Sequence, residues 1–345
     1  MNNEYNNKYI PLVSILCMTY NHKDYIKQCL DGFIMQKTNF NFIAYVGDDC
    51  STDGTTEIIK EYEQKYPHII KGIYHTSNTG GEGNFFDIAN ACKSKYVAWC
   101  DGDDYWIDEY KLQKQVDFLE SNPDYAICSH LCKVVSEVSP PPQPIKDVIC
   151  KEQDITLDMM FYNNHITSNS VMYRWEFNNK SIEKYFPKDI HPGDWYLHLL
   201  HAKQGKIKIF PDIMSCYRVH FGGIDSTLSF EKKVLKYGLK MINFFDCAYK
   251  NITDSSQEYF QNILISSLNL IIDTYVENNK MKELQSVCKK YPKYITEILL
   301  IRNSKLNDEI NKSKKKYKKY KKLFNATLIA LILAILFITF NVFIR

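Results

Sequence analysis

The stretch Tyr96-Val-Ala-Trp-Cys-Asp101-Gly-Asp103-Asp104-Tyr-Trp106 places three carboxylates within four residues, directly after an apolar run. The apolar run predicts a buried strand, and ligands of α/β folds bind outside the carboxyl ends of the strands. Carboxylates this close repel one another, so keeping all of them charged is costly unless a cation lies between them. Oxygen-rich sites favour Mg²⁺ or Mn²⁺. The stretch therefore predicts a divalent-cation site at the end of a strand.

Two other predicted strands end on polar loops in the same way. The apolar run 12–19 stops at Thr19-Tyr20-Asn21-His22, and the run 42–46 stops at Gly47-Asp48-Asp49-Cys50-Ser51-Thr52-Asp53-Gly54-Thr55. A third run, 69–74, precedes a glycine-containing loop, 77–84. Strands and helices alternate four times within the first hundred residues, which predicts an α/β fold with a doubly wound, mostly parallel sheet. In such a sheet the polar loops converge on one crevice.

The charge balance argues against a nucleic-acid-binding body. The chain has 345 residues and a formal net charge of +3, but residues 312–322 contain eight Lys and no acid. Without those Lys, 35 basic residues remain against 40 acidic ones, a net charge of −5. A nucleic-acid-binding domain needs a basic face on the fold itself, which this body lacks.

The cysteines and the first residues indicate a reducing environment. Eleven Cys, an odd number, are scattered without CxxC pairs or the His–Cys spacing of a zinc site. The start, Met1-Asn-Asn-Glu-Tyr5, has neither the basic nor the apolar region of a signal peptide. We therefore expect free thiols in a cytosolic body.

The C-terminal third differs from the rest in pattern. Residues 226–311 are helical by periodicity, and the pattern leaves their role open between acceptor docking, oligomer contact and spacer. Residues 323–344 carry no charge over 22 residues, which predicts a single transmembrane helix behind a polybasic juxtamembrane segment, 312–322. The positive-inside rule then predicts a single-pass protein of the cytoplasmic membrane with its catalytic body in the cytoplasm. The alternative for 323–344 is a buried core helix.

Taken together and in this order, the motifs resemble a family 2 glycosyltransferase of the GT-A fold, of the type that builds bacterial cell-surface glycans. The motifs are Val13-Ser-Ile, Thr19-Tyr20-Asn21, Asp48 to Gly54 and Asp101-Gly-Asp-Asp104, and the resemblance covers about residues 11–226. It implies a nucleotide-sugar donor, which we expect to be UDP-linked, and Mn²⁺ or Mg²⁺ as cofactor. The residues that it implies for nucleotide-sugar binding are Thr19, Tyr20, Asn21, Asp48, Asp49, Asn78, Asn84, Asp101 and Arg218.

The resemblance also implies the metal ligands. Asp103 and Asp104 are the expected ligands from the acidic stretch, while Asp101 holds either the ribose or the water shell of the metal. Tyr217-Arg218-Val-His220 resembles the late family segment whose His can join the metal, so His220 is the third expected ligand. Arg218 could pair with a phosphate or form an internal salt bridge.

The expected catalytic base comes from one further segment. His191-Pro-Gly193-Asp194-Trp195 resembles the family segment that bears the base, which implies Asp194. The chemistry needs one carboxylate to deprotonate the acceptor hydroxyl as it attacks the anomeric carbon. The alternative is that Asp194 only caps its helix.

The expected function is an inverting, metal-dependent glycosyltransferase of the hexosyl or N-acetylhexosaminyl type. It acts on a glycan or lipid-linked acceptor at the cytoplasmic membrane face, binds the membrane through its C-terminal helix and binds no nucleic acid. The expected domains are 1–225, catalytic; 226–311, helical and a candidate oligomer contact; 312–322, polybasic; and 323–344, transmembrane. A catalytically inactive nucleotide-sugar-binding membrane adaptor is the alternative. A nucleotidyltransferase ranks lower because residues 19–22 lack the Gly-rich, basic loop that it needs.

Overall fold

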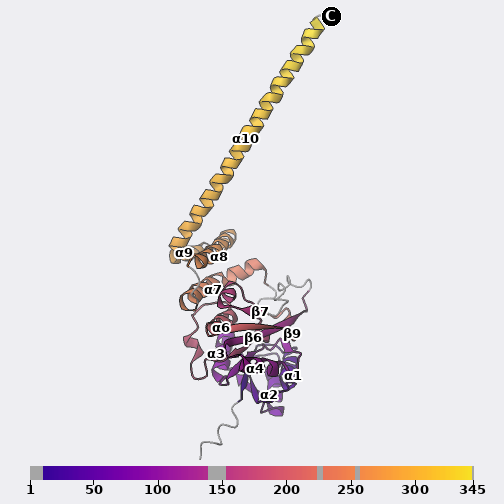
Figure 1. The fold of residues 1–345 in the computed structure, drawn as a ribbon, viewed down its shortest axis with the longest axis vertical. Coiled ribbons are helices and arrows are strands. Elements are labelled where there is room, and N and C mark those ends of the chain that lie inside the picture. The colour runs from indigo at the N-terminus through magenta and orange to yellow at the C-terminus, as the bar shows by residue number, and fades with distance from the viewer. Residues whose placement is uncertain (1–10, 139–152, 224–227, 253–256, 344–345) are drawn as a thin grey trace, which may run out of the picture. The chain divides into compact units, whose positions relative to one another are not determined.

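The computed structural model describes residues 11–138, 153–223, 228–252 and 257–343, and of residues 323–343 it describes only the backbone. Contacts divide the chain into two compact units, Met1–Gln261 and Asn262–Arg345. The first unit carries the sheet and every residue that we expected in the site (Figure 1). The domain boundaries expected from the sequence stay a prediction.

Four parallel strands form the first half of the sheet, in the order β3-β2-β1-β4. They are β1 (Val13–Thr19), β2 (Phe42–Asp48), β3 (Ile70–Tyr74) and β4 (Tyr96–Trp99). The connecting helices are α1 (Ile26–Ile34), α2 (Thr55–Lys65) and α3 (Gly80–Ala91). The central strands β1 and β4 are apolar and buried over almost their whole length, as expected for parallel strands covered on both faces.

The second half of the sheet is mixed, so the expected mostly parallel sheet is wrong there. The order continues β4-β8-β6-β9-β5, and β7 also pairs with β9. The strands are β5 (Tyr105–Trp106), β6 (Tyr125–Ser136), β7 (Gln153–Ile155), β8 (Met172–Arg174) and β9 (Lys206–Val219). Only β6 and β9 pair in parallel among these described strands. The short strand β8 follows a 3₁₀ turn, η1 (Ser168–Ser170), and runs antiparallel to both of its neighbours, β4 and β6.

Five further helices complete the first unit, the last of them running on into the second. They are α4 (Lys111–Ser121), α5 (Leu157–Tyr162), α6 (Gly193–Ala202), α7 (Phe230–Asn251) and α8 (Gln257–Glu277), with a 3₁₀ turn η2 (Ile182–Lys184). The second unit consists of the rest of α8 with α9 (Met281–Lys290) and α10 (Pro292–Phe343). The helical character expected after residue 226 is therefore confirmed.

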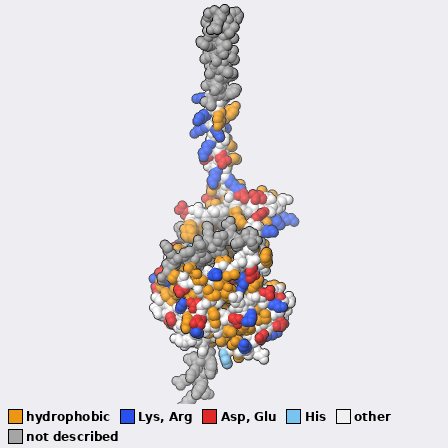
Figure 2. Space-filling model, turned by 90° about the vertical axis from the view of Figure 1, so that its right-hand side faces the viewer, with side chains coloured by type: hydrophobic (Ala, Val, Ile, Leu, Met, Phe, Trp, Pro, Cys, Tyr) orange, Lys and Arg blue, Asp and Glu red, His pale blue; other side chains and the backbone are white. Residues whose placement is uncertain are grey.

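The expected transmembrane helix and single-pass membrane localisation are corrected by the structure. Among the residues that it describes, no helix is both long enough and apolar enough to cross a bilayer. Crossing requires about 20 residues almost without charge, whereas the described side chains of α10 include the eight Lys between 312 and 322 (Figure 2). The side chains of the expected span, 323–344, lie outside the described residues.

Helix α1 fixes the end of the acidic stretch to the core. Its apolar face is buried on the sheet, and Phe33 packs edge-on against the Trp106 ring with the centroids 4.9 Å apart. Gly32 lies so close to β5 that a Cβ there would come within 3.1 Å of the Trp106 backbone nitrogen. Trp106 Nε1 also donates a hydrogen bond to the Asn169 carbonyl at 2.9 Å. These contacts hold the loop before β5 in place.

Thiols fill part of this core. Cys17 and Cys29 lie with their Sγ atoms 3.9 Å apart, and Cys29 also approaches the Asp101 carbonyl at 3.4 Å. All cysteines within the described ranges are free. The expectation of free thiols is therefore confirmed for those residues.

The core also holds a lysine, Lys111, that is 0% exposed. Its Nζ donates a hydrogen bond to Gln115 Oε1 at 2.6 Å and lies 4.1 Å from the centroid of the Trp106 ring. Burial lowers the pKa of Lys111 to about 7, because the charged form loses its hydration and, among the residues that the structure describes, no carboxylate forms an ion pair with its ammonium.

The free energy of unfolding is expected to increase as the pH rises above 7, because Lys111 has a lowered pKa in the folded chain. The unfolded chain keeps this lysine protonated up to its ordinary pKa of 10.5, while the folded chain releases the proton near 7. Stability therefore rises by about 1.4 kcal/mol per pH unit above 7 relative to a Lys111→Met variant, and the difference is flat below 7.

Urea unfolding at pH 6, 7 and 8 measures this difference. Lys114→Met is the matched control, since Lys114 is half exposed, pairs with Asp108 and stays protonated in both states over this range. A wild-type-minus-Lys111→Met difference that is the same at all three pH values contradicts the assignment.

Candidate active site

The acid loop, defined here as residues 101–104, connects β4 to β5 and is clamped to the end of β1. The Gly102 N–H donates to the Met18 carbonyl at 2.8 Å. A Cβ at Gly102 would lie 2.8 Å from both Cβ and Oγ1 of Thr19, so only glycine allows this close approach. The backbone of the acid loop is therefore held in a fixed position next to the end of β1.

Asp101 is bound from two sides. Its Oδ1 accepts from Trp99 Nε1 at 2.8 Å, and its Oδ2 accepts from Ser168 Oγ at 3.2 Å. Burial, followed by the negative charge of Asp103, raises the pKa of Asp101 to about 7, and the charge of Asp194 acts in the same direction. Near neutral pH this carboxyl can thus act either as the donor or as the acceptor of a hydrogen bond with a hydroxyl.

Asp103 faces two histidines. Its Oδ2 lies 3.0 Å from His220 Nε2 and 3.9 Å from His22 Nε2. Burial acts to raise the pKa of Asp103, but the hydrogen bond with His220 and the electrostatic interactions with His22 and His220 outweigh it and leave the pKa below its ordinary value. Asp103 is therefore the carboxylate of the loop that stays charged.

Asp104 points to the sheet and holds β9. It is 2% exposed, and its Oδ1 accepts from the Arg218 backbone N–H at 2.7 Å. Burial and the neighbouring charge of Asp103 raise the pKa of Asp104 well above its ordinary value. The carboxyl thus acts as a link between the acid loop and the end of β9.

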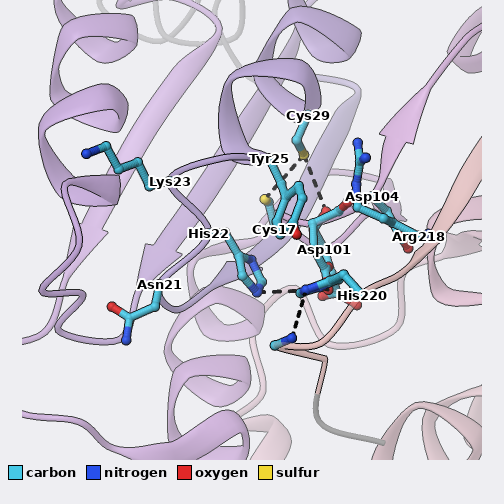
Figure 3. Close-up of polar contacts among 12 residues, drawn as sticks. Cys17, Asn21, His22, Lys23, Tyr25, Cys29, Asp101, Asp104, Arg218 and His220 are labelled. Atoms are coloured by element: carbon cyan, nitrogen blue, oxygen red, sulfur yellow. Dashed lines mark hydrogen bonds and ion pairs between the residues drawn. The ribbon is translucent and has the colours of Figure 1, made fainter. Parts of the chain in front are cut away.

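Arg218 is also occupied within the protein. Its Nε donates to the Asp103 carbonyl at 2.9 Å, Nη1 to Glu137 Oε1 at 3.0 Å, and Nη2 to Gln28 Oε1 at 2.6 Å. The guanidinium lies over the Tyr25 ring, 4.7 Å from its centroid (Figure 3). The structure thus forms the internal salt bridge that the sequence left open as an alternative to phosphate pairing.

Three side chains from distant parts of the chain meet next to the acid loop. His22 comes from the loop after β1, Asp103 from the acid loop and His220 from the end of β9; Figure 3 shows the two imidazoles turned toward each other. One ligand atom from each lies within 4.8 Å of the others. Two imidazoles and one carboxylate are a donor set that holds divalent transition metals. The residues present therefore fit a divalent metal. We call His22, Asp103 and His220, which form this group within the described part of the chain, the metal cluster.

Asp194 belongs to the same region, since its charge acts on Asp101. It occupies the first turn of α6, two positions after the N-cap residue Pro192, and is half-buried. Burial raises the pKa of Tyr217, and so do the charges of Asp104, Asp103, Asp101 and Asp194. Asp194 of α6 and the three acids of the acid loop therefore act electrostatically on the same tyrosine.

The two acids after β2 are engaged with the helices that follow. Asp48 Oδ1 accepts from the Ser51 N–H at 3.2 Å, and its Oδ2 accepts from the Thr56 hydroxyl at the start of α2. Asp53 accepts from both the N–H and the hydroxyl of Thr55, as expected of a structural cap. Asp48 thus supports the turn that begins α2.

Asp49 plays the same part for α3. Its Oδ1 accepts from the N–H and the hydroxyl of Thr79, at 2.6 and 2.8 Å, and its Oδ2 accepts from the Gly80 N–H at 2.9 Å. Asn78 Nδ2 donates to the Asp49 carbonyl at 3.2 Å. Asp49 and Asn78 therefore hold the loop before α3 against the end of β2.

The other residues expected at the nucleotide differ in exposure. Thr19 and Asn84 are each 2% exposed, and Asn84 Nδ2 donates to the Gly47 carbonyl at 3.0 Å. Asn21 has a left-handed backbone and accepts from the Thr52 N–H at 2.9 Å. Tyr20 is 46% exposed beside them. Tyr20 thus offers an exposed aromatic ring to an incoming ligand. The other residues of this set shape the loops around it.

Sequence reasoning missed His22 and Tyr217 as site residues. His22 stands in the polar loop 19–22 that was singled out, but no local pattern separates it from a solvent-exposed histidine. Tyr217 directly precedes Arg218 in the late segment, and only its position among the four acids makes it notable. Both were quoted in the motifs, and neither was assigned a role.

A family model decides the membership of the chain. The model described as glycosyl transferase family 2 matches residues 14–186, half of the sequence. The chain belongs to glycosyl transferase family 2. The family expected from the strand-end motifs is thereby confirmed.

Curated relatives agree with family 2. An uncharacterized protein of Mycobacterium tuberculosis is 38% identical over 212 residues, which cover 61% of this chain and 60% of that one. The putative teichuronic acid biosynthesis glycosyltransferase TuaG of Bacillus subtilis is 29% identical over 162 residues, 47% of this chain and 62% of the relative. The chain thus matches about three fifths of the length of these relatives.

The solved structure of Staphylococcus aureus TarS, residues 1–349, in complex with UDP-GlcNAc is similar in fold to this chain. Its TM-score is 0.55 at 20% identity, with 74% of this chain and 71% of that chain covered. At this identity the likeness bears on the fold, and it supports a GT-A-like mixed sheet followed by helices.

Proposed function

We propose that this chain transfers a hexosyl or N-acetylhexosaminyl group from a UDP-linked donor to a hydroxyl of a glycan or lipid-linked acceptor, with inversion at the anomeric carbon. One observation carries the proposal: His22, Asp103 and His220 bring one ligand atom each to within 4.8 Å of the others, in a region where Asp194 acts electrostatically on Asp101 and Tyr217. Membership of family 2 and the UDP-GlcNAc bound by TarS support the donor class.

The proposed reaction needs one base on the acceptor side. Asp194 serves as that base and takes the proton from the attacking hydroxyl. Inversion follows from a single displacement, because the acceptor oxygen attacks the face opposite the leaving diphosphate and no enzyme nucleophile intervenes. A divalent metal, when bound, supplies positive charge that stabilises the departing diphosphate. Asp103 and His220 are the residues proposed to hold it.

The donor is proposed to lie over the ends of β1, β2 and β4. Asp101, half-protonated at neutral pH, binds a sugar or ribose hydroxyl. Tyr20 offers an exposed aromatic face to the nucleoside. Asn21, Asp48, Asp49, Asn78, Asn84 and Thr19 contribute mainly by fixing the three loops that enclose it. Arg218 contributes by locking the acid loop to β9.

Release of UDP from a panel of UDP-sugars tests the proposal. With Mn²⁺ present, the purified chain is expected to release UDP from one UDP-hexose or UDP-N-acetylhexosamine well above background, while GDP-mannose serves as the control donor. Chelation with EDTA is expected to lower the rate at least about 100-fold, since the metal supplies several kcal/mol of charge stabilisation, and excess Mn²⁺ restores it. UDP binding without turnover of any donor contradicts the proposal and favours an inactive binding protein.

A further inference from the structure

His22 is placed in the metal cluster by the local fold of the loop after β1. Its carbonyl accepts hydrogen bonds from the N–H groups of Tyr25 and Ile26, at 2.9 and 2.8 Å, which anchors the residue at the beginning of α1. Its ring makes edge contacts with Tyr25 and His220, with centroid distances of 6.4 and 6.1 Å. The side chain is thus directed at Asp103 by packing from both sides.

The hydrogen bonds of the protein do not account for this orientation. His22 Nε2 lies 3.9 Å from Asp103 Oδ2, which is beyond hydrogen-bond length. Its Nδ1 is buried and has no hydrogen-bond partner within the described ranges. A metal ion bound at Nε2 and shared with Asp103 and His220 accounts for the orientation of the ring.

The spacing of the three atoms fits one shared ion. Donor atoms bound at about 2.1 Å to one octahedral ion lie about 3 Å apart when adjacent and about 4.2 Å apart when opposite. Asp103 Oδ2 is 3.0 Å from His220 Nε2 and 3.9 Å from His22 Nε2, and no pair exceeds 4.8 Å. Small rotations of the rings bring all three atoms to such distances.

We propose that His22 is the third protein ligand of a divalent transition metal, together with Asp103 and His220, and that this set binds the metal without any nucleotide and in preference to Mg²⁺. A site with only one or two carboxylates depends on substrate phosphates to hold its ion. Three converging protein ligands remove that dependence. Two imidazoles also favour Co²⁺ and Zn²⁺ over Mn²⁺, and all three over Mg²⁺, which prefers oxygen ligands.

The inference deepens the metal part of the proposed function but is measured apart from it. Binding of Mn²⁺ alone requires neither donor nor acceptor, so it reports on the three side chains only. A chain that releases UDP with Mg²⁺ but binds no Mn²⁺ in its absence keeps the proposed function and loses this inference.

Electron paramagnetic resonance of the full chain with Mn²⁺ alone is the test. Wild type is expected to bind one Mn²⁺ that Zn²⁺ displaces and millimolar Mg²⁺ does not, and pulsed spectra are expected to show nitrogen couplings from two imidazoles. His22→Gln is expected to weaken Mn²⁺ binding at least about 10-fold and to leave one coupled imidazole. His68→Gln, which changes an exposed histidine outside the cluster, is expected to match wild type.

Two results overturn the inference. The first is a wild type that binds no Mn²⁺ without UDP, or binds it with fewer than two coupled nitrogens. The second is a folded His22→Gln that keeps wild-type affinity and both couplings. Circular dichroism checks folding; should His22→Gln fail to fold, His22→Glu replaces it, expected to retain Mn²⁺ through an oxygen while one nitrogen coupling disappears.

Discussion

Replacing Asp194 by Asn is expected to lower kcat by about 10²–10⁴-fold while binding of UDP stays within about threefold of wild type. The substitution keeps the size and the first-turn position of the side chain in α6 but removes its ability to accept a proton. The acceptor hydroxyl then has to attack without losing its proton, which raises the barrier of the chemical step alone. Binding of UDP is proposed to involve the ends of β1, β2 and β4 and is not expected to depend on this carboxylate.

Steady-state UDP release and calorimetric titration with UDP measure the two quantities. Asp189→Asn is the matched control, because Asp189 lies five residues earlier, is exposed, and has a left-handed backbone that Asn also tolerates. Retention of kcat in Asp194→Asn contradicts the assignment. Asp101, whose pKa is raised to about 7, then becomes the candidate base.

The strand ends were predictable because the signals that define them are local. The apolar run before Asp101 was expected to form a strand from Tyr96, and β4 is Tyr96–Trp99. Parallel strands buried on both faces show as continuous apolar runs, and the acids that follow stand out against them. Since the topology of such a sheet gathers these ends, the acid loop and the polar loops after β1 and β2 were expected at one edge.

The partners of each acid could not be predicted in the same way. Sequence patterns give residue types, whereas Asp48, Asp49 and Asp104 owe their roles to hydrogen bonds with Thr56, Thr79 and the Arg218 backbone. The His22–His220 pair depends on the end of β9 meeting a loop 198 positions earlier in the chain. No periodicity records such a contact, so the place of His22 beside Asp103 and His220 emerged only from the fold.

Mixed pairing in the second half of the sheet was also hidden. Strands β5 and β8 have two and three residues, too few for a period of two to be recognised. Both pair with strands that are distant in the sequence, β8 with β4 and β6, and β5 with β9. The sequence therefore predicted the parallel half of the sheet, β3-β2-β1-β4, better than the half that ends at Arg218 and His220.

Asp103→Asn and Asp104→Asn are expected to differ sharply, although the two residues are neighbours. Asp103→Asn removes the charge that faces His22 and His220, so it is expected to lower Mn²⁺-dependent UDP release at least about 100-fold and to weaken Mn²⁺ binding. Asp104→Asn is expected to keep activity within about fivefold of wild type. The Asp104 carboxyl is buried with its pKa raised well above the ordinary value, so a neutral amide resembles the form already present.

The asymmetry rests on which atoms the two side chains offer. Asn at 104 keeps an oxygen that can accept from the Arg218 N–H, the bond that holds β9 to the acid loop. Asn at 103 keeps the shape but offers His220 and the metal an uncharged group in place of Oδ2. Mn²⁺ titrations of UDP release, with melting temperatures as the folding control, separate the two effects. The opposite result would be a Mn²⁺ response that is lost in Asp104→Asn and kept in Asp103→Asn. It would contradict the assignment, because the metal would then bind to Asp104, on the side of the loop that faces β9.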